Sequence, residues 1–388
     1  MTERGGHVRA VPKVEGMTPS RTRRTGAPTR KTRSTPPTRR DLEHIRGSLL
    51  GGAIGDALGA AIEFDPLAKI RRRFGPAGLR DYAPAYGREG AVTDDTQMTL
   101  FTAEGLIRAL HRGKGRGIAS APAVVYHAYL EWLETQGGPI PDSTFLRGWL
   151  VGHRALHERR APGHTCLSAL RSGRMGSRRE PLNDSKGCGG AMRIAPVGLI
   201  APAHPFGLGC DLSAITHGHP TGYLAAGFLA QLLHELAEGA TLPDAVKGAE
   251  AVLTRAPGHE ETLAAVQGAV TLARKGKGTP EEAESLGGGW VAEEAVAIAL
   301  FAALVAKDFE HGVLLAVNHG GDSDSTGSIA GNILGLIHGE AAIPTRWLER
   351  LELRDIIEEV AHDLWLHFGE GAPDRTEPCS DLDRYPGN

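Results

Sequence analysis

Apolar residues recur at helical spacing along most of this chain. From Asp41 onward, aliphatic and Ala-rich segments are separated by Gly and Pro breaks. Two of these segments follow helical spacing most clearly, through Leu100, Ala103, Ile107 and Leu110 and through Leu224, Leu229, Leu232, Leu233 and Leu236. Alternation with a period of two, which marks a half-buried strand, is scarce. The pattern therefore predicts an all-α fold, a compact multi-helix bundle.

The longest unbroken apolar run covers 12 residues, 295–306. It is too short to span a bilayer, and Glu293 and Glu294 before it favour a helix N-terminus, so we expect a buried helix. No apolar signal-peptide core follows Met1. No CxxC pair is formed by the four cysteines, Cys166, Cys188, Cys210 and Cys379. We therefore expect a cytoplasmic protein with reduced thiols and no membrane partner.

Glycines at positions 51, 52, 55 and 59 mark a segment in which a second helix could approach closely. Asp56 and Glu63 belong to the same segment and are seven residues apart. That separation is two helical turns, so both carboxylates are expected on one face of a helix. Buried carboxylates are costly without a partner. The segment is therefore a packing helix that could also carry a site.

The formal net charge of −3 over 388 residues hides an uneven distribution. Residues 1–40 contain eleven Lys and Arg but two Glu, a charge of +9, whereas the remainder carries −12. This stretch has almost no large aliphatic residues, so we expect it to be disordered. It could be a solvated tail without function, a weak nucleic-acid contact or a targeting segment. We expect one folded domain over residues 41–370 and a loose C-terminal tail over 371–388.

The first candidate for chemistry is an acidic cluster that precedes a helical pattern, Thr93, Asp94 and Asp95. Such a group is often an ordinary N-cap, with a hydroxyl at the cap and acids in the first turn. The same oxygen atoms could also bind a metal ion. Both interpretations are open at this point.

The second candidate is a Gly-rich turn in which acids alternate with hydroxyls, Asp322, Asp324 and Ser325. Oxygen ligands at this density suit Mg²⁺, Mn²⁺ or Ca²⁺ rather than zinc. An EF-hand loop fails, because its twelfth position would be Ile333, where a bidentate Glu is needed. Together, the two clusters could build a two-metal site that orients a substrate diol and activates a water.

A Gly-rich loop over residues 183–193 lies between the clusters. Its backbone N–H groups could meet a pyrophosphate, although many loops are rich in glycine. His217 and His219 could suggest zinc, but no third ligand lies at a sensible spacing. We expect His217 to lie in a loop or to contact substrate.

Taken in order, these segments resemble the ADP-ribosylglycohydrolase family. The similar segments are GGAIGDALGAAIEF (51–64), VTDDTQMTL (92–100), NDSKGCGGAMRIAPVGL (183–199), THGHP (216–220), GGGWVAEEAVAIAL (287–300) and NHGGDSDSTGSIAGNILGLIHG (318–339). The resemblance implies an orthogonal all-α bundle with a centre of two Mg²⁺ or Mn²⁺ ions. The metal ligands that it implies are Thr93, Asp94, Asp95, Asp322, Asp324 and Ser325.

The resemblance also implies the other parts of the site. Glu63 matches the acidic residue near the scissile bond, and Asp95 and Asp324 are further catalytic candidates. The implied substrate-binding residues are Ser185, Gly187, Cys188, Gly189 and His217. The usual family pattern has Thr where this chain has Ser325, and several relatives have Asn where it has Cys188. Serine keeps the hydroxyl, whereas Cys188 lacks the amide.

The expected function is metal-dependent hydrolysis of the bond between ADP-ribose and an acceptor, most simply a protein side chain such as arginine. Asp324 or a neighbouring carboxylate would take the proton of the attacking water, and carboxylates would stabilise an oxocarbenium-like transition state. Alternatives are ADP-ribosylated nucleic acid, a small ADP-ribosyl metabolite, immunity against an ADP-ribosylating toxin, or a silent crystallin-like relative. We expect a monomer.

Overall fold

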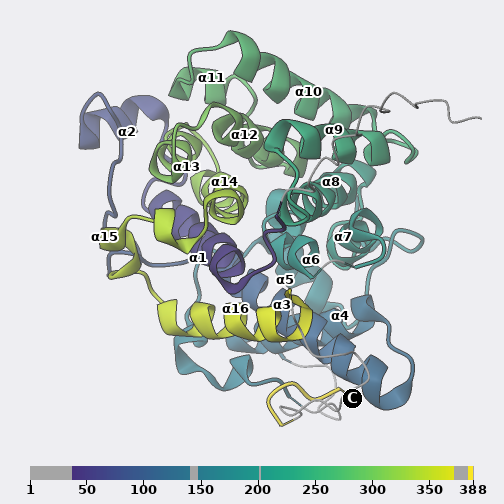
Figure 1. Ribbon diagram of the computed structural model, residues 1–388. Coiled ribbons are helices and arrows are strands. Elements are labelled where there is room, and N and C mark those ends of the chain that lie inside the picture. Colours follow the sequence, from purple (N-terminus) through teal and green to yellow (C-terminus); the bar gives the residue numbers. More distant parts are fainter. Residues whose placement is uncertain (1–36, 140–146, 201, 371–382, 388) are drawn as a thin grey trace, which may run out of the picture. The chain divides into compact units, whose positions relative to one another are not determined.

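A computed structural model describes residues 37–139, 147–200, 202–370 and 383–387. These residues form sixteen α-helices and four short 3-10 helices, and they contain two isolated β-bridges but no strand (Figure 1). The all-α class predicted from the apolar pattern is confirmed. The α-helices are α1 (Leu42–Gly59), α2 (Leu67–Phe74), α3 (Asp94–Arg116), α4 (Ala121–Thr135), α5 (His164–Arg171), α6 (Ala195–Leu199), α7 (Pro205–Ala214), α8 (Pro220–Ala237), α9 (Leu242–Leu253), α10 (Glu260–Lys275), α11 (Pro280–Glu284), α12 (Ala292–Val305), α13 (Phe309–Val317), α14 (Ser323–His338), α15 (Thr345–Leu348) and α16 (Arg354–Phe368). The 3-10 helices are η1 (Leu150–Gly152), η2 (Arg154–His157), η3 (Cys188–Gly190) and η4 (Glu340–Ala342).

The two helices predicted from spacing and the one predicted from an unbroken apolar run are present. Helix α3 contains the apolar positions between 100 and 110, and α8 contains those between 224 and 236. Helix α12 begins with Glu293 and Glu294 in its first turn, and its residues 295–303 are all buried. The expected buried helix is therefore confirmed.

Helices α1 and α14, from opposite ends of the domain, lie side by side in the middle of the fold (Figure 1). Glycines at every fourth position of both helices form the contact, Gly47, Gly51 and Gly55 facing Gly335, Gly331 and Gly327. A Cβ atom added to Gly55 would lie 1.9 Å from the carbonyl oxygen of Gly327. The two backbones thus touch directly, and the predicted close approach is confirmed.

The chain departs from the sequence prediction after α1. The helix ends at Gly59, and residues 60–63 continue as a turn in which the Glu63 N–H donates to the Gly59 carbonyl at 2.9 Å. Phe64 then adopts a left-handed conformation with φ 67°. The expectation that Asp56 and Glu63 share a helix face is therefore wrong, because Glu63 lies beyond the end of the helix.

The second acidic cluster also lies differently from expectation. Helix α14 begins at Ser323, because the Asp322 side chain caps it by accepting a hydrogen bond from the Ser325 N–H. Asp324 and Ser325 therefore lie in the first turn of a helix instead of in the turn before it.

The predicted loose segments, 1–40 and 371–388, lie mostly outside the described residues. Their expected disorder and the domain boundary at residue 370 stay predictions. Within the part of the chain that the structure describes, no helix is both long and apolar enough to cross a bilayer.

Candidate active site

The buried carboxylate of Asp56, in α1, holds the first acidic cluster in place. It accepts hydrogen bonds from the N–H of Thr93, 3.0 Å from each oxygen, and from the N–H of Thr96 at 3.1 Å. Thr93 is the N-cap of α3, and its hydroxyl accepts from the Asp95 N–H at 3.3 Å. The N-cap interpretation of this cluster is confirmed. Asp94 and Asp95 follow in the first turn, with Asp94 accepting from the Gly163 N–H at 3.1 Å.

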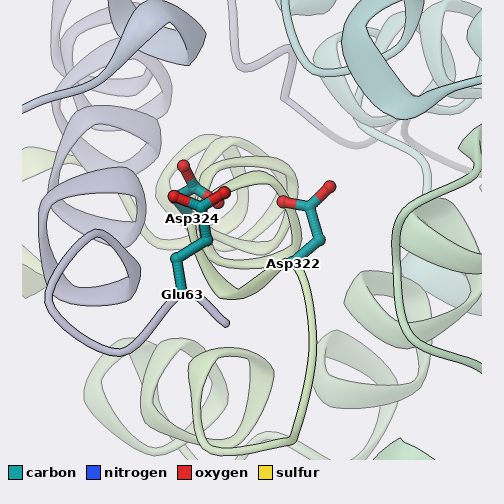
Figure 2. Close-up of side chains that lie close together, drawn as sticks. All are labelled: Glu63, Asp322 and Asp324. Atoms are coloured by element: carbon teal, nitrogen blue, oxygen red, sulfur yellow. The ribbon is translucent and has the colours of Figure 1, made fainter. Parts of the chain in front are cut away.

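The second cluster meets Glu63 at the end of the α1–α14 contact. Figure 2 shows the carboxylates of Glu63, Asp322 and Asp324 gathered together. One oxygen from each lies within 4.8 Å of the others, a grouping that could hold a metal ion. Because α1 and α14 touch through their glycines, the turn after Gly59 is brought directly against the first turn of α14.

Both clusters open into one cavity of about 330 Å³. It is lined by ten of the residues predicted for the site, namely Glu63, Asp94, Asp95, Asp322, Asp324, Ser325, Gly187, Cys188, Gly189 and His217. Among the described residues, the predicted Thr93 and Ser185 do not line it. Thr93 is the N-cap of α3, and the Ser185 hydroxyl accepts a hydrogen bond from the Gly187 N–H at 3.3 Å. Both residues therefore support neighbours that line the cavity.

The carboxylates of the cavity are buried close together, and this raises their pKa values. Burial, followed by the charge of Asp324, raises the pKa of Glu63 to about 9 and that of Asp56 to about 7. Burial also raises the pKa of Asp94, Asp95 and Asp322 well above the usual range, with neighbouring carboxylates adding to the effect. Ionising all of these groups is costly unless a cation is bound among them.

One carboxylate oxygen of the first acidic cluster, in Asp95, is suited to bind such a cation. The Oδ1 atom of Asp95 is buried and has no hydrogen-bond partner in the described part of the chain. Buried polar atoms are almost always satisfied, so this oxygen fits the role of a metal ligand. An all-oxygen donor set of carboxylates and hydroxyls suits Mg²⁺ or Mn²⁺.

His217 is held at the cavity wall as a neutral ring. Its Nδ1 atom lies 2.9 Å from the Thr216 hydroxyl, which in turn accepts from the buried guanidinium of Arg193 at 2.7 Å. Burial, with a smaller contribution from Arg193, lowers the pKa of His217 to about 3. The ring is therefore uncharged at neutral pH and can exchange a hydrogen bond with a ligand.

The Gly-rich loop packs tightly beside this histidine. A Cβ atom at Gly189 would lie 3.0 Å from the Cys166 sulfur and 3.1 Å from the His217 ring. Two of the N–H groups expected to meet a pyrophosphate already donate within the protein, Gly187 to Ser185 and Cys188 to the Trp290 carbonyl at 3.2 Å. The loop is thus fixed from both sides before any ligand binds.

Sequence reasoning missed three features of the site. Asp56 was noted as a carboxylate but not as the group that positions Thr93. The rings of Phe64 and Trp290 stack with centroids 5.1 Å apart and line the cavity while 68% and 43% exposed. Residues 161–166 form another part of the wall. No spacing or composition signal singles out the last two groups, because they meet only through the tertiary fold.

Comparison with known proteins agrees with this geometry. The family model described as ADP-ribosylglycohydrolase matches residues 35–373. An uncharacterised protein of Archaeoglobus fulgidus is 31% identical over 84% of this chain and 97% of its own length. The glycohydrolase of ADP-ribosyl-dinitrogen reductase from Rhodospirillum rubrum is 26% identical over 79% of this chain and 90% of its own length. The ADP-ribosylarginine hydrolase Tri1 of Pseudomonas putida is 24% identical over 84% of this chain and 78% of its own length.

A solved structure supports the same conclusion. It is described as an ADP-ribosylglycohydrolase-related protein complex. It superposes with a TM-score of 0.61 at 29% sequence identity, over 84% of this chain and 97% of its own chain. The family resemblance seen in six ordered segments is thus confirmed over nearly the whole domain. The chain belongs to the ADP-ribosylglycohydrolase family and is a glycosidic-bond hydrolase.

Proposed function

We propose that this hydrolase releases ADP-ribose from arginine side chains of proteins, with two Mg²⁺ or Mn²⁺ ions as cofactors. The observation that carries the proposal is the single cavity into which Asp94, Asp95, Asp322, Asp324 and Glu63 converge. Relatives named for ADP-ribosylarginine and for ADP-ribosyl-dinitrogen reductase support an arginine-linked, protein-borne substrate.

The two acidic clusters provide the proposed ligands. Thr93, Asp94 and Asp95 would hold one side of the centre, and Asp322, Asp324 and Ser325 the other. When bound, the two ions would supply Lewis-acid polarisation and orientation of the ribose hydroxyls. The Asp95 Oδ1 atom, which lacks a hydrogen-bond partner among the described residues, and the mutually raised pKa values of the carboxylates support this assignment.

The protein's own groups would perform the remaining steps. Asp324 lies fully buried at the start of α14 and would accept the proton of the attacking water. The carboxylates around it would stabilise the positive charge that develops at the anomeric carbon. Glu63, in the turn after α1 and less buried than Asp324, would face the bond to the acceptor. The neutral His217 would donate or accept a hydrogen bond with the ribose.

The test is release of ADP-ribose from an ADP-ribosylated arginine protein, measured with Mg²⁺, with Mn²⁺ and with EDTA. Asp95→Asn and Asp324→Asn should each reduce turnover by at least about a thousandfold, since each removes a charge from the centre. The matched control is Asp211→Asn, whose carboxylate is on the surface and pairs with Arg178. Circular dichroism shows whether each variant is folded.

Full activity in EDTA, or in either site variant, would contradict the two-metal proposal. Serine-linked and nucleotide-linked ADP-ribose are assayed beside the arginine substrate. If one of them is hydrolysed faster at saturation and arginine-linked ADP-ribose is not turned over, the arginine part of the proposal is wrong.

A further inference from the structure

A buried arginine lies behind the histidine of the cavity wall. Arg193, between η3 and α6, is completely buried, and it forms no ion pair with any of the described residues. Its guanidinium lies 4.3 Å from the centre of the Tyr129 ring. A buried charge without a carboxylate partner is costly. The polar groups that Arg193 contacts instead are those that hold His217.

Thr216 links the guanidinium to the histidine. The Nη2 atom of Arg193 donates to the Thr216 hydroxyl at 2.7 Å and to the Leu212 carbonyl at 3.3 Å. The same hydroxyl lies 2.9 Å from the Nδ1 atom of His217. A guanidinium has donors only, so the Thr216 oxygen must accept from it. The hydroxyl proton is then free to be donated to Nδ1.

The opposite arrangement leaves the hydroxyl proton without a good acceptor. If Nδ1 carried a proton, the Thr216 oxygen would accept from both the ring and Arg193. The hydroxyl proton would then turn to the nearby sulfur of Cys166. A thiol sulfur is a weak acceptor, and this one already accepts from Arg193 at 3.5 Å. The hydrogen bonds therefore favour a neutral ring with its proton on Nε2.

The Nε2 atom of His217 faces the Gly-rich loop of the cavity. A Cβ atom added to either Gly187 or Gly189 would lie 3.4 Å from it, and all three residues line the cavity. His217 is buried, and its Nε2 atom has no hydrogen-bond partner in the part of the chain that the structure describes. Because buried polar atoms are almost always satisfied, a proton on Nε2 suits an acceptor atom of a bound ligand.

We infer that Arg193 is a positioning residue of this hydrolase: through Thr216 it fixes His217 in the Nε2–H tautomer, which donates a hydrogen bond to an oxygen atom of ADP-ribose. The identity of the ligand rests on the proposed function, whereas the tautomer does not. Arg193 does not line the cavity, so it acts only through Thr216 and His217. A ring fixed as a donor accepts the hydroxyl or phosphate oxygens of a nucleotide and disfavours an N–H group at the same place.

Nitrogen NMR of the full chain, labelled in its histidine rings, measures the tautomer without any turnover. The protonated and unprotonated nitrogens of a neutral imidazole resonate separately, and the His217 signals are identified by their loss in His217→Gln. The wild-type protein should show a bare Nδ1 and a protonated Nε2. Thr216→Val and Arg193→Met should each convert this state into a mixture of tautomers.

The matched control is Thr262→Val. Thr262 is also a buried threonine, and its hydroxyl donates to the Thr221 carbonyl outside the cavity. This variant should keep the wild-type His217 signals. A wild-type His217 with its proton on Nδ1 overturns the inference. A tautomer that is unchanged in both Thr216→Val and Arg193→Met also overturns it, because the pair would then not determine the position of the proton.

Affinity for ADP-ribose gives a second readout. His217→Phe keeps a ring but loses the donor, so calorimetric titration with ADP-ribose should show binding weakened by about three- to tenfold, the effect of one hydrogen bond. His217→Gln supplies an amide donor and should restore most of the affinity. If His217→Phe binds ADP-ribose as tightly as the wild type, or His217→Gln is as weak as His217→Phe, the donor role is wrong.

These outcomes separate the inference from the proposed function. An active hydrolase whose His217 carries its proton on Nδ1 refutes the inference alone. A protein with the expected tautomer and the expected ADP-ribose affinities that releases no ADP-ribose from any substrate refutes the proposed function alone.

Discussion

The glycine contact between α1 and α14 makes a sharp prediction for the variant Gly55→Ala. The new Cβ atom would lie 1.9 Å from the Gly327 carbonyl oxygen, about 1.5 Å short of ordinary contact at 3.4 Å. The obstructing atom belongs to backbone, so no side-chain rotation relieves it, and the two helices must separate. Overpacking of this kind costs about 1–3 kcal/mol, and the backbone clash places Gly55→Ala near about 3 kcal/mol. For a domain of this size, that is a decrease in Tm of about 4 °C.

The matched control is the same substitution in an open helix position. Gly115 lies in α3 with nothing within 4 Å of an added Cβ atom. Gly115→Ala should stabilise the protein by about 0.5–1 kcal/mol, since alanine loses less backbone freedom. Differential scanning calorimetry measures both variants. If Gly55→Ala melts within about 1 °C of the wild type, the direct backbone contact is not what holds these helices together.

Three further predictions concern charge in and around the site. In the metal-free protein, Tm should fall as the pH rises from about 6.5 to about 8.5. The pKa is raised to about 7 for Asp56 and to about 9 for Glu63, so the folded protein holds protons that the unfolded chain has already lost. The lowered pKa values of His217, about 3, and His319, about 4, make stability rise with pH, but only below about pH 6.5. A metal-free Tm that rises between about pH 6.5 and about pH 8.5 contradicts the raised pKa values of the two carboxylates. Mn²⁺ at about 100 times its Kd should add about 2.7 kcal/mol of stability, and the gain should grow with pH because protons compete for the ligands, as a thermal-shift series would show. Arg193→Met should lower the free energy of unfolding, measured in urea, by about 2–4 kcal/mol. The buried Thr216 hydroxyl and Leu212 carbonyl would lose the guanidinium that donates to them. A loss under about 0.5 kcal/mol would mean that water replaces the guanidinium as their donor.

Sequence reasoning succeeded where the determinants are local. Thr93 is followed directly by two acids, and it caps α3 as the N-cap interpretation expects. The similar cap that Asp322 forms on α14 was not predicted, because the sequence there indicates a Gly-rich turn. Capping depends on a few neighbouring residues, so its position is readable from a short segment. Glycines at every fourth position likewise predict a close contact with another helix, although they do not identify α14 as that helix.

The errors and omissions depend on tertiary contacts. The chain leaves α1 at Gly59, where a side chain would meet the backbone of Asp324, and that collision is invisible without α14. The stack of Phe64 on Trp290 joins residues more than 220 positions apart. The 161–166 wall has no periodicity, and its place in the cavity follows from Gly163 reaching Asp94.

The paired glycines of α1 and α14 also constrain how the length of this chain can vary. One residue inserted between Gly47 and Gly59 would rotate the rest of α1 by about 100°, turning side chains toward α14 and Asp56 away from Thr93. An insertion in α1 and a compensating one in α14 would have to occur together. Length variation among related enzymes should therefore be absent from these two helices and confined to connections such as residues 75–91, whatever acceptor each enzyme serves.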